Sequence, residues 1–493
     1  MKIFFQKTYL FLCIFASLFV LNACKDKTEQ PTEVSNVNRF INDCFEVFYL
    51  WNDKLPNVNV KTETDSYAFF NKMKYRDDYW SSLTNDVRAM EESFSGEETT
   101  FGYSLVFYYS ELAESYFGVV RYVHSDSPAA NAGLKRGDLI LKVNGEGITE
   151  SNYLNLYYAP SLSLELGKYE NGTTNLTGET VLMNAVKAYM NPIITYKIIE
   201  KATQKIGYLH YSDYLLKSHQ DLKTVFSEFI AANVSEIILD LRYNGGGYSI
   251  TSKFLCSMLL SQDKLNGRNI YLKEIWNSDY MSYFEREGND MNEYFSNPIG
   301  YRDVDGKDVS ETIDINFEGL QKIYILTGSG TASASEATIV GLMPYMNDGV
   351  VLIGDTTHGK FCGGSILSPG VIYQTTGGGK KWFDDIRNWG AYIMLYRYSN
   401  ANSYPNHTNG LAPDYLVEED ILRNPYALGD ENEPLLAKAI ELITGISSTD
   451  AVLKTMPLPT TYRPANELKT PLKALDGKMI DDKFGLFQPL IIR

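Results

Sequence analysis

Apolar and polar residues follow different periods in successive parts of the chain. Between about residues 35 and 94 the apolar positions recur at intervals of three and four, which is typical of amphipathic helices. Pro56 interrupts this pattern, so we expect two helical pieces. Their apolar positions are Phe40, Ile41, Cys44, Phe45, Phe48 and Tyr49 in the first piece, and Tyr67, Phe69, Phe70, Met73 and Trp80 in the second. Aromatic stripes at this spacing are more often core than ligand site, so we predict a packing or lid region.

Short strands and glycine turns replace the helical period from about residue 99. Strands are predicted at 101–105, 116–123 and 139–143. Pro128 can begin a short helix that Gly133 ends. Asn144 and Gly145 then form a turn signal after the third strand. This part of the chain is therefore predicted to be a small β-rich domain.

Strand-like and helix-like segments alternate between about residues 191 and 430, which indicates an α/β core. Open α/β sheets place their sites in the loops that follow the carboxyl ends of strands. Residues 266–313 lack a clear period and are predicted to be an insertion, and the proline-containing stretch beyond residue 445 is predicted to be a peripheral tail. The predicted strands are 205–211, 236–241, 323–326 and 349–354, and the predicted helices are 222–232, 251–260 and one beginning at Ser335.

Composition and the N-terminus narrow the class of protein. A length of 493 residues favours about three domains. The net charge of −16 argues against nucleic-acid binding through a basic surface. Lys2 and Lys7 precede an apolar stretch over residues 9–20, and Leu21-Asn22-Ala23-Cys24 follows at once. This order resembles the lipobox of bacterial lipoproteins, which implies cleavage before Cys24 and a lipid anchor on it, with a plain secretory signal or an uncleaved anchor as the alternative.

The remaining cysteines and the histidines give no sign of a disulfide framework or a metal site. Cys13 lies in the predicted signal peptide, which leaves Cys44, Cys256 and Cys362, an odd number at wide spacing. The five histidines show no ligand spacing such as HExxH. We therefore expect no metal and no other cofactor.

Candidate chemistry lies in the small-residue loop 328–336, between a buried strand and a helix. Ser329, Ser333 and Ser335 are all possible nucleophiles there, because the first free N–H groups of the helix face any anion that forms nearby. A serine needs a neighbouring base, and Lys360 could serve if burial lowered its pKa. The amide after the serine and an amide of the glycine run 245–247 are candidate oxyanion donors.

Residues 127–145, SPAANAGLKRGDLILKVNG, resemble a PDZ domain. Such domains bind peptide ends by adding a strand to a sheet edge. The resemblance implies that Gly102, Tyr103, Ser104 and Leu105 form the loop that binds a peptide carboxylate. An ordinary strand start is the alternative interpretation of those four residues.

Four further motifs resemble the C-terminal-processing (tail-specific) serine peptidases: residues 240–247, residues 331–336, Gly354 with 358–360, and 410–414. The resemblance implies an α/β (α+β) protease core of crotonase-like type with Ser333 as nucleophile and Lys360 as general base. It also implies that Gly246 and Ala334 supply the oxyanion hole. The order of parts agrees with that family: signal peptide 1–23, linker and helical region 24–98, PDZ domain 99–190, protease core 191–445 and C-terminal tail 446–493.

The chain departs from the family at one position. Many members carry a glutamine four residues after the lysine, and here that residue is Gly364. Ser365 or another group could substitute for it. His210 is a second candidate base, because the related tricorn-type proteases use a histidine, and His358 could tune the lysine. Asp240 and Arg242 are expected to brace the glycine loop, and Cys362 lacks a base of its own.

The sequence therefore predicts a lipid-anchored serine endopeptidase of the bacterial cell envelope, on the periplasmic or outer-membrane side. Its predicted partners are extended or unfolded polypeptides, captured by the PDZ domain, and a membrane bound through Cys24. Because of the missing glutamine, a catalytically inactive peptide-binding lipoprotein is the alternative. A weaker interpretation is a carbohydrate- or nutrient-binding lipoprotein, suggested by 36 tyrosines and the anchor. Substrate identity and oligomeric state stay open.

Overall fold

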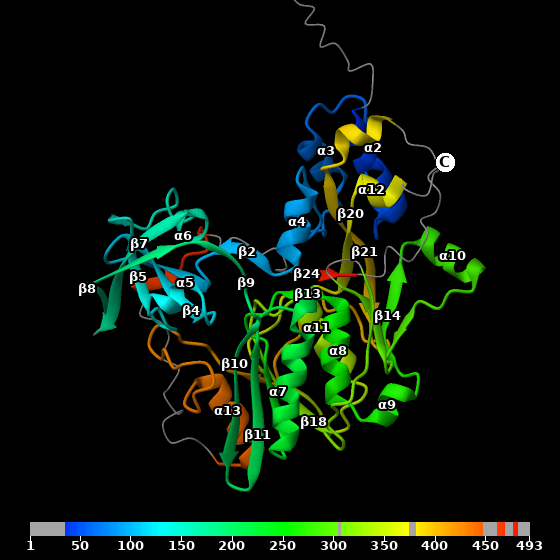
Figure 1. The fold of residues 1–493 in the computed structure, drawn as a ribbon. Helices are drawn as coiled ribbons and strands as arrows, with labels where there is room; N and C mark the ends of the chain where they lie inside the picture. The colour runs from blue at the N-terminus through cyan, green and yellow to red at the C-terminus, as the bar shows by residue number, and fades with distance from the viewer. Residues whose placement is uncertain are drawn as a thin grey trace, which may run out of the picture.

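The computed structural model describes residues 35–170, 172–303, 307–373, 381–446, 461–468 and 477–481. The predicted signal peptide and Cys24 lie outside these residues. Figure 1 shows three parts: a helical N-terminal region, a β-rich domain and a larger α/β core. In the described part of the chain, every helix is too short or too polar to cross a bilayer.

The N-terminal region packs against the core, as its apolar stripe predicted. It contains α2 (Asn36–Asp43), a π-helical turn (Cys44–Phe48), α3 (Ser66–Met73) and α4 (Val87–Phe94). The Asp65 carboxylate caps α3 by accepting the amides of Tyr67 and Ala68. Phe40 and Phe45 are fully buried in the main hydrophobic core. Two positions differ from the prediction, because Tyr67 is 42% exposed and Trp80 lies outside the helices, just before the short strand β1 (Ser82–Thr84).

The β-rich domain is an antiparallel sheet in the order β23-β3-β4-β5-β7-β8, with β6 beside β5. Asn144 and Gly145 have φ values of 52° and 83°, the turn geometry expected from their sequence. β2 (Glu97–Thr100) pairs with β9 (Val186–Tyr189) where the chain enters and leaves the domain. The other elements are β3 (Tyr103–Ser110), β4 (Ser115–Val123), α5 (Pro128–Asn131), β5 (Leu139–Val143), β6 (Glu146–Gly147), α6 (Asn155–Tyr158), β7 (Ser161–Glu170), β8 (Thr173–Asn184) and, from the C-terminal region, β23 (Tyr462–Pro464).

The core is built on a six-stranded sheet in the order β10-β11-β12-β18-β19-β22, parallel from β11 onward. Leu209, Leu239 and Ile325 are in register across three strands and face the main core with helices α7 and α8, whereas α13 packs on the opposite face. Successive side chains of these strands point to opposite faces of the sheet, and apolar residues are buried on both faces. The bounds are β10 (Ile193–Lys201), β11 (Gln204–Tyr211), α7 (His219–Ala231), β12 (Glu236–Asp240), α8 (Ser249–Leu259), β18 (Lys322–Thr327), α11 (Ala334–Leu342), β19 (Gly349–Gly354), β22 (Tyr415–Leu416) and α13 (Pro434–Thr444).

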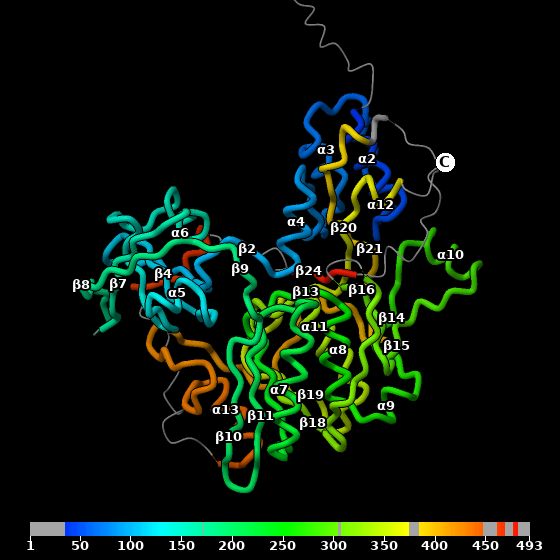
Figure 2. Tube along the Cα trace, viewed as in Figure 1, coloured from blue at the N-terminus to red at the C-terminus, as the bar shows by residue number. Residues whose placement is uncertain are grey.

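A second sheet has the order β13-β24-β20-β21-β14-β15, with β1 added to β21. It corrects two predictions, because residues 266–313 supply strands of this sheet and the C-terminal stretch is not wholly peripheral. In Figure 2 the red strand β24 lies beside β13. The strands of this sheet and the elements between them are β13 (Gly246–Tyr248), α9 (Gln262–Asn266), β14 (Ile270–Trp276), α10 (Ser278–Glu287), β15 (Asn292–Tyr294), the separate pair β16 (Ile299–Arg302) and β17 (Asp308–Glu311), β20 (Cys362–Leu367), α12 (Pro369–Tyr373), β21 (Gly390–Ser399) and β24 (Lys478–Ile480).

Candidate active site

The predicted nucleophile lies where β18 turns into α11. Ser333 is the N-cap residue of α11, is fully buried and has φ 63° and ψ −111°. A serine on a strained turn between strand and helix is the geometry of a nucleophile elbow. Ser335 instead donates to Asn244 O at 3.0 Å, and Ser329 is exposed on the loop. Of the three serines, Ser333 is the one that lies at this turn with a hydroxyl that has no hydrogen-bond partner among the described residues.

The glycine run after β12 approaches this serine closely. A Cβ on Gly246 would lie 2.8 Å from Ser333 Cβ, and Gly246 has φ 118°, so a side chain there would both clash and be strained. The Gly246 amide donates to Asn244 Oδ1 at 2.9 Å. The Ala334 amide is the first of α11. The two predicted oxyanion donors thus flank Ser333, and one of them is engaged by Asn244 in this structure.

Lys360, which follows β19, is fully buried. Its Nζ donates to Gly477 O and lies 3.3 Å from the Tyr392 hydroxyl. The rings of Trp80 and Tyr392 lie 5.6 and 5.3 Å from Nζ. Burial lowers the pKa of Lys360 to about 7. A lysine in this environment can lose its proton near neutral pH, which a general base requires.

Glu336 joins the serine turn to the lysine loop. One carboxylate oxygen accepts the amides of Ser333 at 2.8 Å and Lys360 at 2.9 Å. The other accepts the Gly359 amide at 2.7 Å and the Thr357 hydroxyl at 2.6 Å. Burial raises the pKa of Glu336 to about 7 against these hydrogen bonds. Sequence reasoning assigned no role to this residue, although Ser333 and Glu336 have the S-x-x-E spacing of a capping box.

The serine and lysine side chains are not joined in this structure. Among the described residues, no hydrogen bond links Ser333 Oγ to Lys360 Nζ, whose contacts are with Gly477 and Tyr392. The Tyr398 hydroxyl lies 2.8 Å from Lys360 O and 3.2 Å from Ser333 O. The two backbones are therefore held together while the lysine ammonium is bound elsewhere.

The backbone of this structure leaves no room for a side chain at position 364. A Cβ on Gly364 would lie 2.3 Å from Ile393 O of the neighbouring strand, so no side chain fits there. Ser365 does not replace it, because its hydroxyl donates to Asp481 O at 3.1 Å. The hydroxyl of Tyr392 on β21 contacts the lysine ammonium instead. No local sequence signal pointed to Tyr392, since it reaches the lysine through pairing of β20 with β21.

The two histidine candidates do not contact the serine hydroxyl. His210 is fully buried between the rings of Tyr122 and Tyr243, and neither ring nitrogen has a hydrogen-bond partner in the described part of the chain. Burial lowers the pKa of His210 to about 4. His358 is exposed, and its amide donates to Thr331 O. His407, which the sequence did not single out, lies 3.9 Å from the Glu336 carboxylate and is buried.

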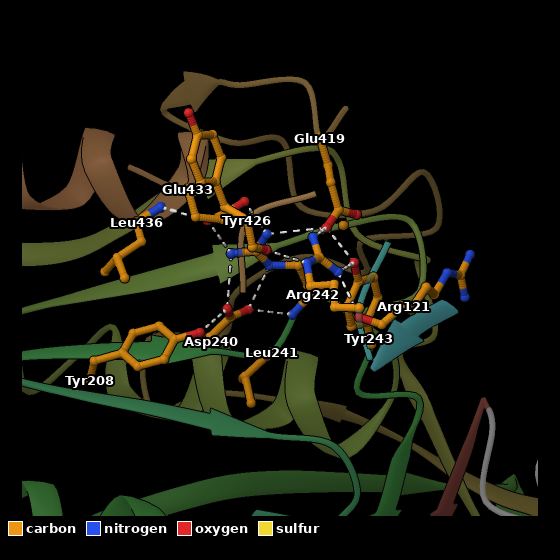
Figure 3. Close-up of polar contacts among 12 residues, drawn as sticks. Arg121, Tyr208, Asp240, Leu241, Arg242, Tyr243, Glu419, Tyr426, Glu433 and Leu436 are labelled. Carbon is orange, nitrogen blue, oxygen red and sulfur yellow. Dashed lines mark hydrogen bonds and ion pairs between the residues drawn. The ribbon is translucent and has the colours of Figure 1, made fainter. Parts of the chain in front are cut away.

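Asp240 and Arg242, which precede the glycine run, belong to a buried ion cluster (Figure 3). Arg242 donates to Asp240 at 3.0 Å and to both carboxylate oxygens of Glu433. Glu419 accepts from Arg242 and, at 2.6 Å, from Arg136 of the β-rich domain. The neighbouring arginines hold the pKa of Glu419 at about 2 despite burial. This cluster joins the β-rich domain to the start of the glycine run.

The predicted carboxylate-binding loop begins at Gly102, which has φ 80°. Its carbonyl accepts the His124 amide at 2.8 Å, and a Cβ would lie 2.2 Å from Ser127 Cβ. Tyr103, Ser104 and Leu105 lie in β3, paired with β4. Peptide binding at this loop stays a prediction.

A buried lysine, a serine on a strained turn and an attached β-rich domain define a serine-peptidase fold with a PDZ-like domain. Three family models match the chain: the peptidase family S41 over residues 205–417, the peptidase S41 N-terminal domain over 36–82 and a PDZ domain over 119–156. The chain belongs to peptidase family S41. The family, the mixed α/β fold and the PDZ-like domain predicted from sequence are thus confirmed.

Individual relatives agree with this assignment. The carboxyl-terminal-processing peptidase 1, chloroplastic, of Arabidopsis thaliana is 25% identical over 293 residues, covering 59% of this chain and 50% of that protein. The carboxy-terminal processing protease CtpB of Bacillus subtilis is 23% identical over 299 residues, covering 59% and 51%. The match therefore spans about half the length of these curated relatives.

A solved structure shows the same fold. The crystal structure of a Bacteroides fragilis protein assigned as an S41 protease is 24% identical. It covers 83% of this chain and 98% of its own, with a TM-score of 0.64. At this identity the likeness bears on the fold alone.

Proposed function

We propose that this protein is a serine endopeptidase that hydrolyses peptide bonds in extended or unfolded polypeptides. Ser333 is the nucleophile and Lys360 the general base. The observation that carries the proposal is that one buried carboxylate, Glu336, binds the backbone amides of both residues and so fixes serine and lysine beside each other.

The chemistry follows from the protonation state of the lysine. The neutral amine of Lys360 takes the proton of Ser333 Oγ as the oxygen attacks the substrate carbonyl. The amides of Ala334 and Gly246 bind the resulting oxyanion once the Gly246 amide leaves Asn244. The Lys360 ammonium then protonates the leaving amine, and water hydrolyses the acyl-enzyme by the same steps. A pKa of about 7 lets the lysine act in both directions near neutral pH.

The PDZ-like domain supplies the substrate-binding part of the proposal. It captures a polypeptide C-terminus by adding a strand to its sheet, with Gly102 at the start of the carboxylate-binding loop. Two relatives are named for carboxyl-terminal processing, which supports a substrate end as the target. The Arg136 contact with the Tyr243 hydroxyl at 2.7 Å connects this domain to the glycine run.

The test of the catalytic assignment uses purified chain and a fluorescein-labelled unfolded protein. Ser333→Ala should abolish cleavage without loss of folded structure, because the Ser333 hydroxyl is not part of the hydrogen bonds that hold the turn. Ser329→Ala, an exposed serine of the same loop, is the matched control and should retain full activity. Equal cleavage by wild type and Ser333→Ala would exclude the assignment. If the wild-type chain binds the polypeptide but neither cleaves it nor reacts with a reactive-serine probe, an inactive peptide-binding protein would be favoured.

The location is part of the same proposal. Lipidation of Cys24 would hold the enzyme at the cell envelope, on the periplasmic or outer-membrane side. Labelled palmitate should be incorporated into the wild-type chain and not into Cys24→Ser. Incorporation into both proteins would refute the anchor.

A further inference from the structure

Two segments of the C-terminal region pair with strands near the predicted peptide-binding sites: β23 at an edge of the PDZ-like sheet, and β24 between β13 and β20. β23 pairs antiparallel with β3 in the register Arg463↔Tyr109, which makes it the edge strand of the PDZ-like sheet. The pairing continues where the Ala465 amide donates to Phe107 O at 3.0 Å. The segment therefore runs toward the predicted carboxylate-binding loop, and PDZ domains accept ligands by the same kind of strand addition.

Side chains of this segment are well packed. Tyr462 is 5% exposed, with its ring 5.6 Å from that of Phe117. Ala465 and Leu468 are buried in the hydrophobic core of the PDZ-like domain. Residues 461–468 thus cover the β3 edge with backbone hydrogen bonds and apolar contacts together.

The second segment, residues 477–481, fills the active-site slot, which we define as the space between β13 and β20. β24 runs parallel to both strands. The Gly477 amide donates to Gly245 O at 2.7 Å, and the Asp481 amide donates to Gly364 O at 2.9 Å. The Tyr392 hydroxyl donates to Met479 O at 2.8 Å. The segment is therefore bound through its backbone, and the side chains of Met479 and Ile480 are buried in the core beside it.

This segment lies directly beside the reacting groups. The Lys478 carbonyl oxygen and Ser333 Cβ are 2.6 and 2.8 Å from the position that a Cβ on Gly246 would occupy. Gly477 O accepts from Lys360 Nζ, the group that must take the serine proton. While this contact exists, the lysine ammonium is directed at the C-terminal segment.

We propose that the C-terminal segment is a tethered occupant of the substrate path, in which residues 461–468 cover the PDZ edge and residues 477–481 fill the active-site slot. An extended polypeptide substrate must displace β24 before Lys360 can reach Ser333. This proposal rests on the proposed peptidase function. For an effective concentration on the order of 1 mM, an assumed dissociation constant of about 0.1 mM for the free segment would leave the slot about one-tenth open.

The test severs the tether after the protein has folded. Residues 469–476 are replaced by the recognition sequence of a site-specific protease, and the cut protein is separated from the fragment that begins near residue 477. In a Ser333→Ala background, binding of a labelled unfolded polypeptide is measured by fluorescence anisotropy. Cutting should tighten binding about tenfold, and a synthetic peptide of residues 477–493 should reverse this effect where a scrambled peptide does not.

A matched control places the same recognition sequence within residues 447–460. Cutting there leaves residues 461–468 and 477–481 on one fragment, so the change in binding should be much smaller. Unchanged binding after the first cut would overturn the proposal. Loss of folded structure would overturn it too, because it would mean that β24, with Met479 and Ile480 in the core, is an integral strand. With Ser333 intact, cleavage should rise in parallel. Tighter binding without any cleavage would support the tethered occupant while refuting the peptidase function.

Discussion

Replacement of Lys360 by methionine should abolish cleavage and remove a destabilising charge from the folded chain. Lys360 is fully buried, and burial lowers its pKa from the ordinary 10.5 to about 7. The unfolded chain therefore binds one proton more than the folded chain between about pH 7 and 10.5. Wild-type stability must then rise with pH across this window, relative to a variant that has no titrating group at this position.

The size of the effect follows from the shift. One pKa unit corresponds to about 1.4 kcal/mol, so the buried charge costs about 5 kcal/mol at pH 6. At pH 9 the folded lysine is neutral and the remaining cost is about 2 kcal/mol. Methionine also loses the hydrogen bonds to Gly477 O and the Tyr392 hydroxyl, about 1 kcal/mol each. This loss depends little on pH, so the stability gained by the substitution should be about 2–3 kcal/mol larger at pH 6 than at pH 9.

Urea unfolding at pH 6, 7.5 and 9, followed by tryptophan fluorescence, measures this difference. Both proteins should carry Ser333→Ala to prevent self-digestion. Lys72→Met is the control, because Lys72 has a side chain that is 54% exposed. A difference between Lys360→Met and its parent that does not change with pH would refute the lowered pKa, and with it the reason for assigning Lys360 as base.

Three other predictions concern residues near Ser333 and Lys360 and the contact between the PDZ-like domain and the core. Glu336→Gln should lower the free energy of unfolding in urea by about 2–4 kcal/mol and lower cleavage more than tenfold, because the new amide N–H would face backbone N–H donors. Cleavage at the wild-type rate would contradict the positioning role of Glu336. Tyr392→Phe should lower kcat about tenfold and move the inflection of the pH–rate profile, since the hydroxyl contacts the lysine. Tyr396→Phe, whose hydroxyl has no partner among the described residues, should leave that profile unchanged. Arg136→Met should separate the melting of the PDZ-like domain from that of the core in calorimetry, because it breaks the contacts with Glu419 and Tyr243; a single unchanged transition would argue against the link.

Local sequence signals predicted much of the fold. Strands 139–143 and 349–354 have the predicted bounds, because each is a short apolar run closed by glycine or a turn pair. The order of helical region, PDZ-like domain and α/β core was also readable, since each part has its own hydrophobic period. Within the site, Ser333 and Lys360 follow adjacent parallel strands, β18 and β19, and such loops meet at the carboxyl edge of the sheet.

Tertiary structure decided what surrounds those residues. Gly477 contacts Lys360 across 117 residues of chain, and β24 joins β13 to β20, yet a three-residue strand carries no period that sequence reasoning can detect. Position 364 has no space for a side chain because the carbonyl of Ile393 on the neighbouring strand lies against Gly364, and local sequence does not reveal this contact. The sequence by itself determined the parts of the molecule and the candidate serine and lysine. Strand pairing over long distances determined which groups contact the lysine and which strand lies between β13 and β20.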